Sequence, residues 1–440
     1  MSIIRKVAFL LVIIACTMAV QARDFDKAKL DKYFQTLNEN NKFMGSVSVF
    51  HNGNEIYSCA VGFADVDKQV ANRELSKYCI GSISKMFTAV MIFQTIDAGE
   101  LSLSQTINKY FPSIKNAEKI TIADLLSHRS GIHNFTENGS FSKWAAKSKE
   151  QMIDIISAGG SDFEPDIRAD YSNSNYVLLS YILESIYKKP YTDILVEKIT
   201  HPLSLNSTYF GKSTIDINNN ESNSYSYSDK WQIQSVTNPS VTLGAGCIIS
   251  NAKDLNRFAN ALFNGKLVTA NSLYAMKNIR DDVGLGLFPV PYFSKQGYGH
   301  RGGVDGFNSM LIYMPDDKMS YSITSNGLNY NFTEIHIAVL NCIYGQQFDI
   351  PRFEKQNVRI AALIDFTGRY KSSQYPLAVT VISNGNTLSI QAEGQPAISL
   401  EADSEHVFRF IKNDLIAIFN PINSTMILIQ GESVFYFKKS

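Results

Sequence analysis

The segment Cys79–Leu101, CIGSISKMFTAVMIFQTIDAGEL, places a serine and, three residues later, a lysine at the start of an apolar helix. The helix is apolar on nearly all sides, which is typical of a helix buried at the centre of a domain. Ser82 and Lys85 lie on the same face of it, one turn apart. Because burial lowers the pKa of a lysine, a neutral Lys85 amine would be able to accept the proton of the Ser82 hydroxyl. The segment therefore predicts a core helix that carries a candidate nucleophile and its base.

The Ser-x-x-Lys pattern also has a purely structural interpretation. Ser82 would be the N-cap of the helix, and Lys85 would extend its ammonium group to solvent. Two further motifs, in order along the chain, favour the chemical interpretation. The stretch FEPDIRADYSNSNYVLLSYILE puts Tyr171 and Asn173 in a turn before the next helix. The stretch YGHRGGVDGFNS is strand-like and carries a histidine and two glycines, His300, Gly302 and Gly303.

Together these three motifs are similar to those of the serine β-lactamase and penicillin-binding protein superfamily. The order Ser-x-x-Lys, Tyr-x-Asn and His-x-Gly resembles the branch that contains class C β-lactamases, D-alanyl-D-alanine carboxypeptidases and related esterases. Three segments between and around the motifs are also similar to segments of that branch: ITIADLLSHRSGI, LGAGCIISNAKDLNRFANALFNGKL and SMLIYMPDDKMSYSITSNG. The resemblance extends over residues 28–345.

The resemblance implies an acyl-enzyme mechanism. Ser82 would attack a carbonyl group, with Lys85 and Tyr171 sharing the general-base work. Tyr171 would be drawn towards the phenolate by the lysine cation, and would later protonate the leaving group and activate the hydrolytic water. Asn173 would hold Lys85 and a substrate amide. The backbone N–H groups of Ser82 and Gly303 would form the oxyanion hole.

Several positions depart from the pattern of the family. His300 stands where most β-lactamases of this kind carry a lysine, and Arg301 follows it. We hypothesise that the Arg301 guanidinium binds a substrate carboxylate. The alternative is a solvent-facing Arg301, because successive strand residues face opposite ways. Asp166 and Cys247 stand where glycines are usual in the family. These two differences bear on the geometry of the loops and not on the catalytic residues.

The composition of the chain limits the classes of partner that it could bind. The 440 residues are 45% hydrophobic, enough for a large core and more than one domain. Lysine plus arginine equal aspartate plus glutamate at 41 each, so no overall field attracts nucleic acid. The sequence has no CxxC and no HExxH, and its seven histidines are scattered. We expect no nucleic-acid partner, no cofactor and no metal.

The first residues predict export. Arg5 and Lys6 precede an apolar run, and Val20-Gln21-Ala22 offers small residues for cleavage, which predicts a signal peptide at residues 1–22 and a periplasmic or secreted protein. The run is shorter than the roughly 20 residues that span a bilayer. The segment ending at Cys16 resembles a lipoprotein box, so membrane association is expected only if Cys16 is lipidated. The four remaining cysteines suit either disulfides or buried thiols: Cys59, Cys79, Cys247 and Cys342.

The pattern along the chain predicts two folded domains. Residues 23–345 form the hydrolase domain, of class α/β or α+β, with an antiparallel sheet flanked by helices. Residues 346–358 read as a linker. Residues 359–440 show short alternating runs separated by turn residues, which predicts a C-terminal all-β domain, a small barrel or sandwich. Within the hydrolase domain we expect a helix at 25–37, a hairpin around 51–54, mostly helix over 81–199, a loop-rich stretch at 204–240, a helix at 251–262 and strands over 297–325.

The functional prediction is an exported serine hydrolase that forms an acyl-enzyme on Ser82. It resembles D-alanyl-D-alanine carboxypeptidases and other D-peptidases or esterases, so its substrate would be a small peptide, amide, ester or β-lactam. One alternative is a true class C-like β-lactamase. His300 makes this alternative less favoured, because most such enzymes carry a lysine at this position. An alternative of another class is a catalytically silent binding or scaffold protein with the same fold.

Overall fold

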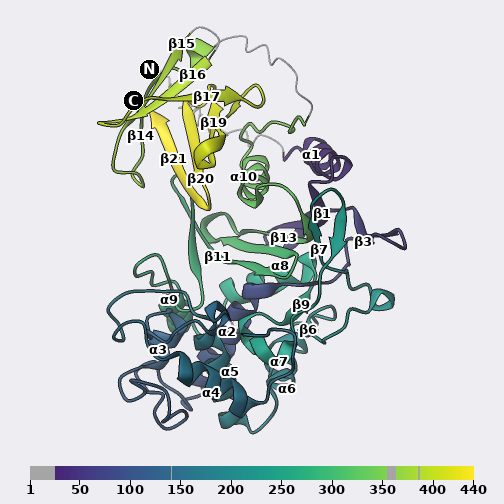
Figure 1. Cartoon of the computed structure of the whole chain (residues 1–440), viewed down its shortest axis with the longest axis vertical. Helices are drawn as coiled ribbons and strands as arrows, with labels where there is room; N and C mark the ends of the chain where they lie inside the picture. The colour runs from purple at the N-terminus through teal and green to yellow at the C-terminus, as the bar shows by residue number, and fades with distance from the viewer. Residues whose placement is uncertain (1–24, 140, 354–362, 385–386) are drawn as a thin grey trace, which may run out of the picture.

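An antiparallel sheet brings together strands from the two ends of the hydrolase region (Figure 1). Its order is β10-β11-β12-β13-β1-β2, and the pairing of β1 with β13 sets Phe43 opposite Leu328. The short strands β7 and β8 extend it beside β13. The bounds are β1 (Phe43–His51), β2 (Asn54–Val61), β7 (Tyr225–Tyr227), β8 (Trp231–Ile233), β10 (Phe288–Tyr292), β11 (Lys295–Val304), β12 (Phe307–Met314) and β13 (Met319–Leu328).

The computed structural model describes residues 25–139, 141–353, 363–384 and 387–440. The predicted signal peptide (1–22), Cys16 and part of the predicted linker lie outside these residues. Within them, the helices are too short or too polar to cross a bilayer. The domain boundaries near residues 345 and 358 stay predictions.

The sheet separates two apolar cores. Alternate residues of β12 face opposite ways. Leu311 packs into the core of the helical region, whereas Ile312 packs into a core with helices α1 and α10. Helices α2 and α8 belong to the first core, and α8 lies against β1, β12 and β13. The bounds are α1 (Lys27–Glu39), α2 (Ser84–Asp97), α8 (Ala252–Phe263) and α10 (Phe332–Ile343).

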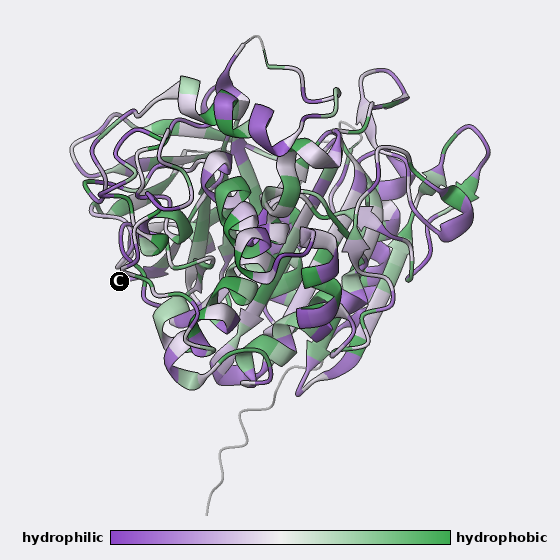
Figure 2. Ribbon diagram, turned by 90° about the horizontal axis from the view of Figure 1, so that it is seen from below, coloured by the Kyte–Doolittle hydropathy of each residue, from purple (hydrophilic) through white to green (hydrophobic). Residues whose placement is uncertain are grey.

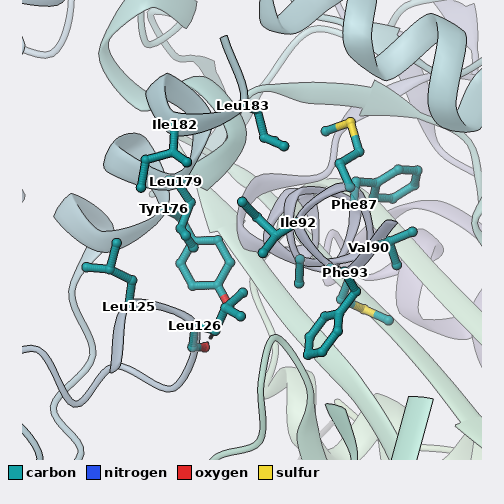
Figure 3. Close-up of a cluster of buried hydrophobic side chains, with 14 of the residues drawn as sticks. Phe87, Val90, Ile92, Phe93, Leu125, Leu126, Tyr176, Leu179, Ile182 and Leu183 are labelled. Atoms are coloured by element: carbon teal, nitrogen blue, oxygen red, sulfur yellow. Dashed lines mark hydrogen bonds between the residues drawn. The ribbon is translucent and has the colours of Figure 1, made fainter. Parts of the chain in front are cut away.

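Helix α2 is the buried helix expected from its apolar sequence. Figure 3 shows its side chains Phe87, Val90, Ile92 and Phe93 among residues of α3 and α5. The Tyr176 hydroxyl of α5 donates a hydrogen bond to the carbonyl of the last residue of α3, at 2.8 Å. Because all these side chains are buried, α2 is packed against its neighbours on all sides. The neighbouring helices are α3 (Ile122–Leu126), α4 (Lys149–Gly159), α5 (Asn173–Tyr187), α6 (Tyr191–Leu195) and the π-helical turn η3 (Val196–Thr200).

The region 81–199 is less helical than predicted. After α2 the chain runs through turns until α3, although its apolar residues Leu101, Ile107, Phe111 and Ile114 are buried in the core. The apolar spacing of this stretch therefore reflects burial in the core and not a helix. Strand β10 was also missed. Its sequence, FPVPY, holds two prolines, which a strand tolerates at the edge of a sheet, and β10 is an edge strand.

The other predicted elements of the hydrolase region form. Hydrophilic loops surround the apolar helices and strands at the centre of the molecule (Figure 2). The stretch 204–240 is loop-rich as expected. The remaining short elements are β3 (Phe63–Asp65), β4 (Val70–Ala71), β5 (Tyr78–Cys79), η1 (Gly81–Ile83), η2 (Phe135–Glu137), β6 (Tyr209–Phe210), η4 (Ile217–Asn219), α7 (Pro239–Thr242), η5 (Leu243–Ala245), β9 (Ile248–Ser250), α9 (Ala270–Met276) and η6 (Pro315–Asp317).

The C-terminal strands close into a barrel, one of the two predicted forms. Strand β21 returns to pair with β14, which leaves the eight strands without a free edge. Figure 1 shows the barrel at one end of the molecule, with α10 between it and the sheet. The bounds are η7 (Leu363–Phe366), β14 (Gly368–Lys371), β15 (Val379–Asn384), β16 (Thr387–Ala392), β17 (Ile398–Ala402), β18 (Val407–Phe410), η8 (Ile411–Asn413), β19 (Leu415–Asn420), β20 (Thr425–Gln430) and β21 (Ser433–Lys439).

The barrel has an inner and an outer apolar surface. Aromatic and aliphatic side chains, such as Phe408 and Phe419, fill its interior. On its outside, Ile416 and Ile429 join the core that contains α1 and α10. An ion pair adds to this contact, because the Arg409 guanidinium donates to the Glu334 carboxylate of α10 at 2.6 Å. The barrel is therefore packed onto the hydrolase region through one wall.

The four cysteines outside the N-terminal segment are free thiols. Cys79 donates to the Gly246 carbonyl at 3.4 Å. Burial raises the pKa of Cys79 to about 12, so its thiol stays protonated at neutral pH.

Candidate active site

The Lys85 amine lies at the centre of the candidate site. Its side chain is 0% exposed. Nζ lies 3.0 Å from Ser82 Oγ, 2.8 Å from Asn173 Oδ1 and 2.6 Å from the carbonyl oxygen of Ala245. Desolvation holds the pKa of Lys85 well below its ordinary value. The buried lysine therefore contacts three oxygen atoms and forms no ion pair with a carboxylate of the described residues, which favours the neutral amine.

Ser82 Oγ lies between the lysine and a tyrosine. Ser82 is in the turn η1, directly before α2, and the Tyr171 hydroxyl donates to its Oγ at 2.7 Å. Tyr171 is 37% exposed, but its hydroxyl points inward to this bond. Desolvation raises the pKa of Tyr171, and the bond with Ser82 opposes this in part. The predicted nucleophile and both predicted bases are thus brought together.

Asn173 is held from its other side. It is the first residue of α5, and its Nδ2 lies within 3.4 Å of Asn134 Oδ1 and 3.3 Å of Thr136 Oγ1. The Asn173 backbone N–H also donates to Asn134 Oδ1, at 3.1 Å. These bonds turn the Asn173 carbonyl oxygen towards Lys85, as the family resemblance implied.

Glycines let β11 touch the nucleophile turn. A Cβ on Gly302 would lie 2.1 Å from the Ile80 carbonyl oxygen and 2.4 Å from Ser309 Oγ. Gly81, with φ of 51°, lies against Gly303 in the same way, since its Cβ would be 2.8 Å from the Gly303 nitrogen. Side chains at these positions would push β11 away from Ser82. The close approach is what the predicted oxyanion hole requires.

His300 faces this site from β11. Its ring lies 6.3 Å from the Tyr171 ring, and its Nδ1 lies 2.5 Å from the Arg301 carbonyl oxygen. Because a carbonyl only accepts, Nδ1 carries the proton, and the buried Nε2 is an acceptor without a partner among the described residues. Burial, followed by the nearby Lys85, lowers the pKa of His300 to about 3. The residue that replaces the usual lysine is therefore neutral at pH 7.

A second histidine, His128, packs behind the tyrosine. Its ring stacks on the Tyr171 ring with centroids 4.3 Å apart, and its Nδ1 accepts the Ser172 backbone N–H at 3.1 Å. The His128 backbone is left-handed, with φ of 56°, and its carbonyl accepts the Asp170 N–H at 2.8 Å. Burial lowers the pKa of His128, so its ring is neutral as well. His128 contacts Tyr171 by its ring and holds the residues on both sides of it.

The loop before Tyr171 is fastened by ion pairs. Asp166, the position where the family usually has glycine, is left-handed with φ of 65°. Its carboxylate accepts hydrogen bonds from Arg129 at 2.7 Å and from Arg280 at 2.5 Å. The position therefore keeps the backbone form that glycine favours, and the carboxylate anchors the loop.

Arg301 is not part of this cluster. Its guanidinium donates to Glu432 of the barrel at 2.7 Å and lies over the Phe332 ring of α10. These contacts are on the opposite face of the sheet from Ser82. The hypothesis that Arg301 binds a substrate carboxylate does not fit this geometry, and strand alternation is the physical reason.

A cleft of about 460 Å³ opens beside the cluster. Ser82, Asn173 and Gly303 lie in its wall, so the nucleophile faces a space large enough for a small substrate. Lys143 and Asp305 are also in the wall, and their side chains form an ion pair of 2.9 Å.

Several contributors to the site were missed in the sequence. Any residue has a backbone carbonyl, so the acceptor role of Ala245 carries no signal of its own. His128, Asn134 and Thr136 lie in or just after the segment ITIADLLSHRSGI, which pointed to the family but not to their contacts. Lys143 lies in a polar stretch without a motif. Only the folded chain brings these residues to Tyr171 and Asn173.

Comparison with known proteins agrees with this geometry. A family model described as Beta-lactamase matches residues 30–340. A penicillin-binding protein of Bacillus subtilis (strain 168) is 26% identical over 412 residues, which cover 86% of this chain and 90% of that protein. The teichoic acid D-alanine hydrolase of Staphylococcus aureus is 28% identical over 189 residues, 43% of this chain and 45% of that protein.

A solved structure shares the fold. The D-amino acid amidase from Ochrobactrum anthropi SV3, complexed with L-phenylalanine amide, superimposes with a TM-score of 0.65. It is 24% identical in sequence, and the match covers 72% of this chain and 97% of that chain. The family model spans more than half of the chain, and the resemblance drawn from the three motifs is confirmed. The protein is a serine hydrolase that belongs to the β-lactamase family.

Proposed function

We propose that this hydrolase cleaves peptides or amides of D-amino acids through an acyl-enzyme on Ser82. The observation that carries the proposal is the buried chain of contacts from Lys85 Nζ through Ser82 Oγ to the Tyr171 hydroxyl, with separations of 3.0 and 2.7 Å. A hydroxyl between a base and an acid, open to a cleft, is the arrangement that acyl transfer needs.

Lys85 is the general base in this proposal. A neutral amine has two N–H groups and one lone pair. Asn173 Oδ1 and the Ala245 carbonyl only accept hydrogen bonds, so they take the two N–H groups. The lone pair is then directed to Ser82 Oγ, where it receives the hydroxyl proton as Oγ attacks the substrate carbonyl.

Tyr171 is the acid that protonates the leaving amine. Its raised pKa favours the phenol, so the resting site holds a neutral amine and a phenol instead of the ammonium and phenolate pair that the resemblance implied. When the C–N bond has broken, Lys85 holds the serine proton and Tyr171 is a phenolate, and transfer of that proton from Lys85 Nζ to the Tyr171 oxygen restores the neutral amine and the phenol. Water then attacks the ester with the same two groups as base and acid.

The relatives support the choice of substrate. One is a D-alanine hydrolase and another is a penicillin-binding protein. The amidase with the same fold is named for D-amino acids. The neutral His300, in place of a permanent cation, supports a peptide or amide substrate over a β-lactam.

Export is part of the same proposal. Arg5, Lys6 and the apolar run after them support a signal peptide, and peptides with D-amino acids occur in bacterial walls outside the cytosol. Fractionation of cells that express the full chain, with sequencing of the mature N-terminus, tests it. A protein that stays in the cytosol with its first residues intact would contradict export.

Intact-mass spectrometry tests the nucleophile. The wild type and Ser82→Ala are incubated with a fluorescent penicillin and, separately, with a fluorophosphonate. An adduct that forms on the wild type and not on Ser82→Ala supports the acyl-enzyme, and a penicillin adduct points to D-alanyl peptides or β-lactams. Turnover of the penicillin would favour a β-lactamase. Folded protein without an adduct from either probe would favour a non-catalytic scaffold.

A further inference from the structure

The charges in the cleft wall are unequally exposed. Among the described residues that line the cleft, Lys143 and Asp305 carry formal charge. They form an ion pair, but the Lys143 side chain is 43% exposed and the Asp305 side chain only 3%. Lys143 is therefore the accessible member of this pair in the cleft wall, with its Nζ also 5.7 Å from the centroid of the Trp144 ring, and Asp305 is the buried member.

Asp305 has little capacity for further hydrogen bonds. Its Oδ1 accepts the Lys143 ammonium at 2.9 Å and the Thr237 hydroxyl at 2.8 Å, and its Oδ2 accepts the Thr237 backbone N–H at 2.8 Å. An ammonium group has three N–H donors. Asp305 takes one of them, so the exposed head of Lys143 has donors left for a group that enters the cleft.

The segment that carries Lys143 is fixed in place. The Asn238 N–H donates to the Lys143 carbonyl at 2.9 Å, and the Lys147 N–H donates to the Ser240 hydroxyl at 2.9 Å. Phe141 packs edge-on against Phe135, with ring centroids 5.0 Å apart. Because backbone and side chain are both anchored, little conformational entropy would be lost when a ligand binds the ammonium.

We propose that Lys143 binds a carboxylate of the substrate in the cleft beside Ser82. A carboxylate forms short, charge-assisted hydrogen bonds with an ammonium group. Lys143 would thus take the role that the sequence suggested for Arg301, which lies on the other face of the sheet against Glu432. The inference rests on the proposed function, since it concerns the substrate of the same cleft.

Kinetics with a matched pair of substrates test this. Acetyl-D-alanyl-D-alanine and its C-terminal amide share the bond to be cleaved and differ in the carboxylate. We expect Lys143→Met to raise KM for the acid about tenfold or more, the loss expected for one charge-assisted hydrogen bond, and to change KM for the amide less than about twofold. Lys143→Arg keeps the charge and should keep the preference for the acid.

Lys295 offers a matched control. It is 35% exposed and paired with Asp317 at 2.8 Å, but it lies at the start of β11, away from the cleft wall. Lys295→Met should leave both KM values unchanged. Equal effects of Lys143→Met on acid and amide, or a selective loss of the acid with Arg301→Met, would overturn the inference.

Binding measurements separate this inference from the proposed function. Calorimetry with acetyl-D-alanyl-D-alanine in the Ser82→Ala background requires no turnover. About tenfold weaker binding after Lys143→Met supports the carboxylate site even if the wild type cleaves neither substrate, in which case only the proposed function fails. Unchanged binding overturns the carboxylate site whatever the activity. Circular dichroism melting of each variant confirms that it is folded.

Discussion

His300 and Arg301 are adjacent in β11 and face opposite sides of the sheet. The His300 ring lies next to Tyr171, whereas the Arg301 guanidinium reaches the turn between β20 and β21 and pairs with Glu432. One dipeptide therefore contacts both the candidate site and the barrel. Because successive strand residues face opposite ways, the two residues have different partners, although they are neighbours in the same sequence motif, YGHRGGVDGFNS.

Replacing Lys85 should stop acylation. Lys85→Arg keeps a cation that does not deprotonate, and Lys85→Met removes the amine. We expect both to lower the rate of adduct formation with a fluorophosphonate by about 10²–10⁴, the usual contribution of a general base. In stopped-flow measurements, an Arg variant that reacts at the wild-type rate would exclude Lys85 as the base.

The pH dependence of acylation checks the lowered pKa of Lys85. An unperturbed lysine, with a pKa of about 10.4, would lose about a factor of ten in neutral amine for each unit of pH below that value. Because desolvation lowers the pKa of Lys85, we expect the wild-type rate to fall less steeply than this between pH 9 and pH 7. A tenfold fall per unit across this range would contradict the buried neutral amine.

Acid should destabilise the fold through its buried histidines. The pKa of His300 is lowered to about 3 by burial, against about 6.5 in an unfolded chain. Between these values the unfolded state binds a proton that the folded state does not, so the free energy of unfolding falls as the pH falls, by about 1.4 kcal/mol per unit for one such group. His300→Gln should reduce this slope in urea titrations from pH 6.5 to pH 4.

His336 is the matched control for this measurement. Burial also lowers its pKa to about 3, and it lies in α10 on the far side of the sheet from Ser82. His336→Gln should therefore reduce the slope by a similar amount while acylation continues. A wild-type stability that does not change over the acid range would contradict both shifts.

Glycine at position 302 should be essential to the approach of β11 to Ser82. An added Cβ would lie 2.1 Å from the backbone oxygen of Ile80, which has little freedom to move. We expect Gly302→Ala to cost about 1–3 kcal/mol in urea denaturation and to slow acylation. Gly303→Ala is the comparison, because its Cβ meets no atom within 4 Å. Its stability should stay within about 0.5 kcal/mol of the wild type.

The Arg409–Glu334 pair should carry part of the contact between barrel and sheet. The Glu334 side chain is 6% exposed, and removal of its partner leaves a buried charge unpaired. We expect Arg409→Met to lower the free energy of unfolding by about 3 kcal/mol, and Glu334→Gln in the same chain to restore part of it. Arg369→Met, which breaks the exposed pair with Glu393, should cost less than about 1 kcal/mol. Equal losses for the two arginines would contradict this role.

The sequence was most informative where spacing alone determines geometry. Ser82 and Lys85 share a helix, so their contact follows from the three-residue interval. The contact of Lys85 with Ala245, by contrast, joins residues far apart through a backbone carbonyl, which no side-chain pattern marks.

The errors have definite physical causes. The hypothesis for Arg301 placed its side chain at the substrate, with a solvent-facing side chain as the alternative. The face of a strand residue depends on the register of the strand, which the sequence does not give. Leu101 and Ile107 are buried in turns, because the core accepts apolar side chains from irregular backbone as well as from helices. In both cases the deciding contacts come from other segments of the chain.

The pairing of β1 with β13 has a consequence for the order in which the chain is made. Ser82 and α2 are synthesised well before β11 and β13. Strand β1 can pair with β2 early, but its other partner, β13, is made much later. Such distant pairing is slow to form and exposes unpaired strands in the meantime. A nascent chain that ends before β11 carries the serine, the lysine and the tyrosine but lacks Gly302 and Gly303. The contacts of the nucleophile turn with Gly302 and Gly303 therefore require a chain that has been synthesised through β11.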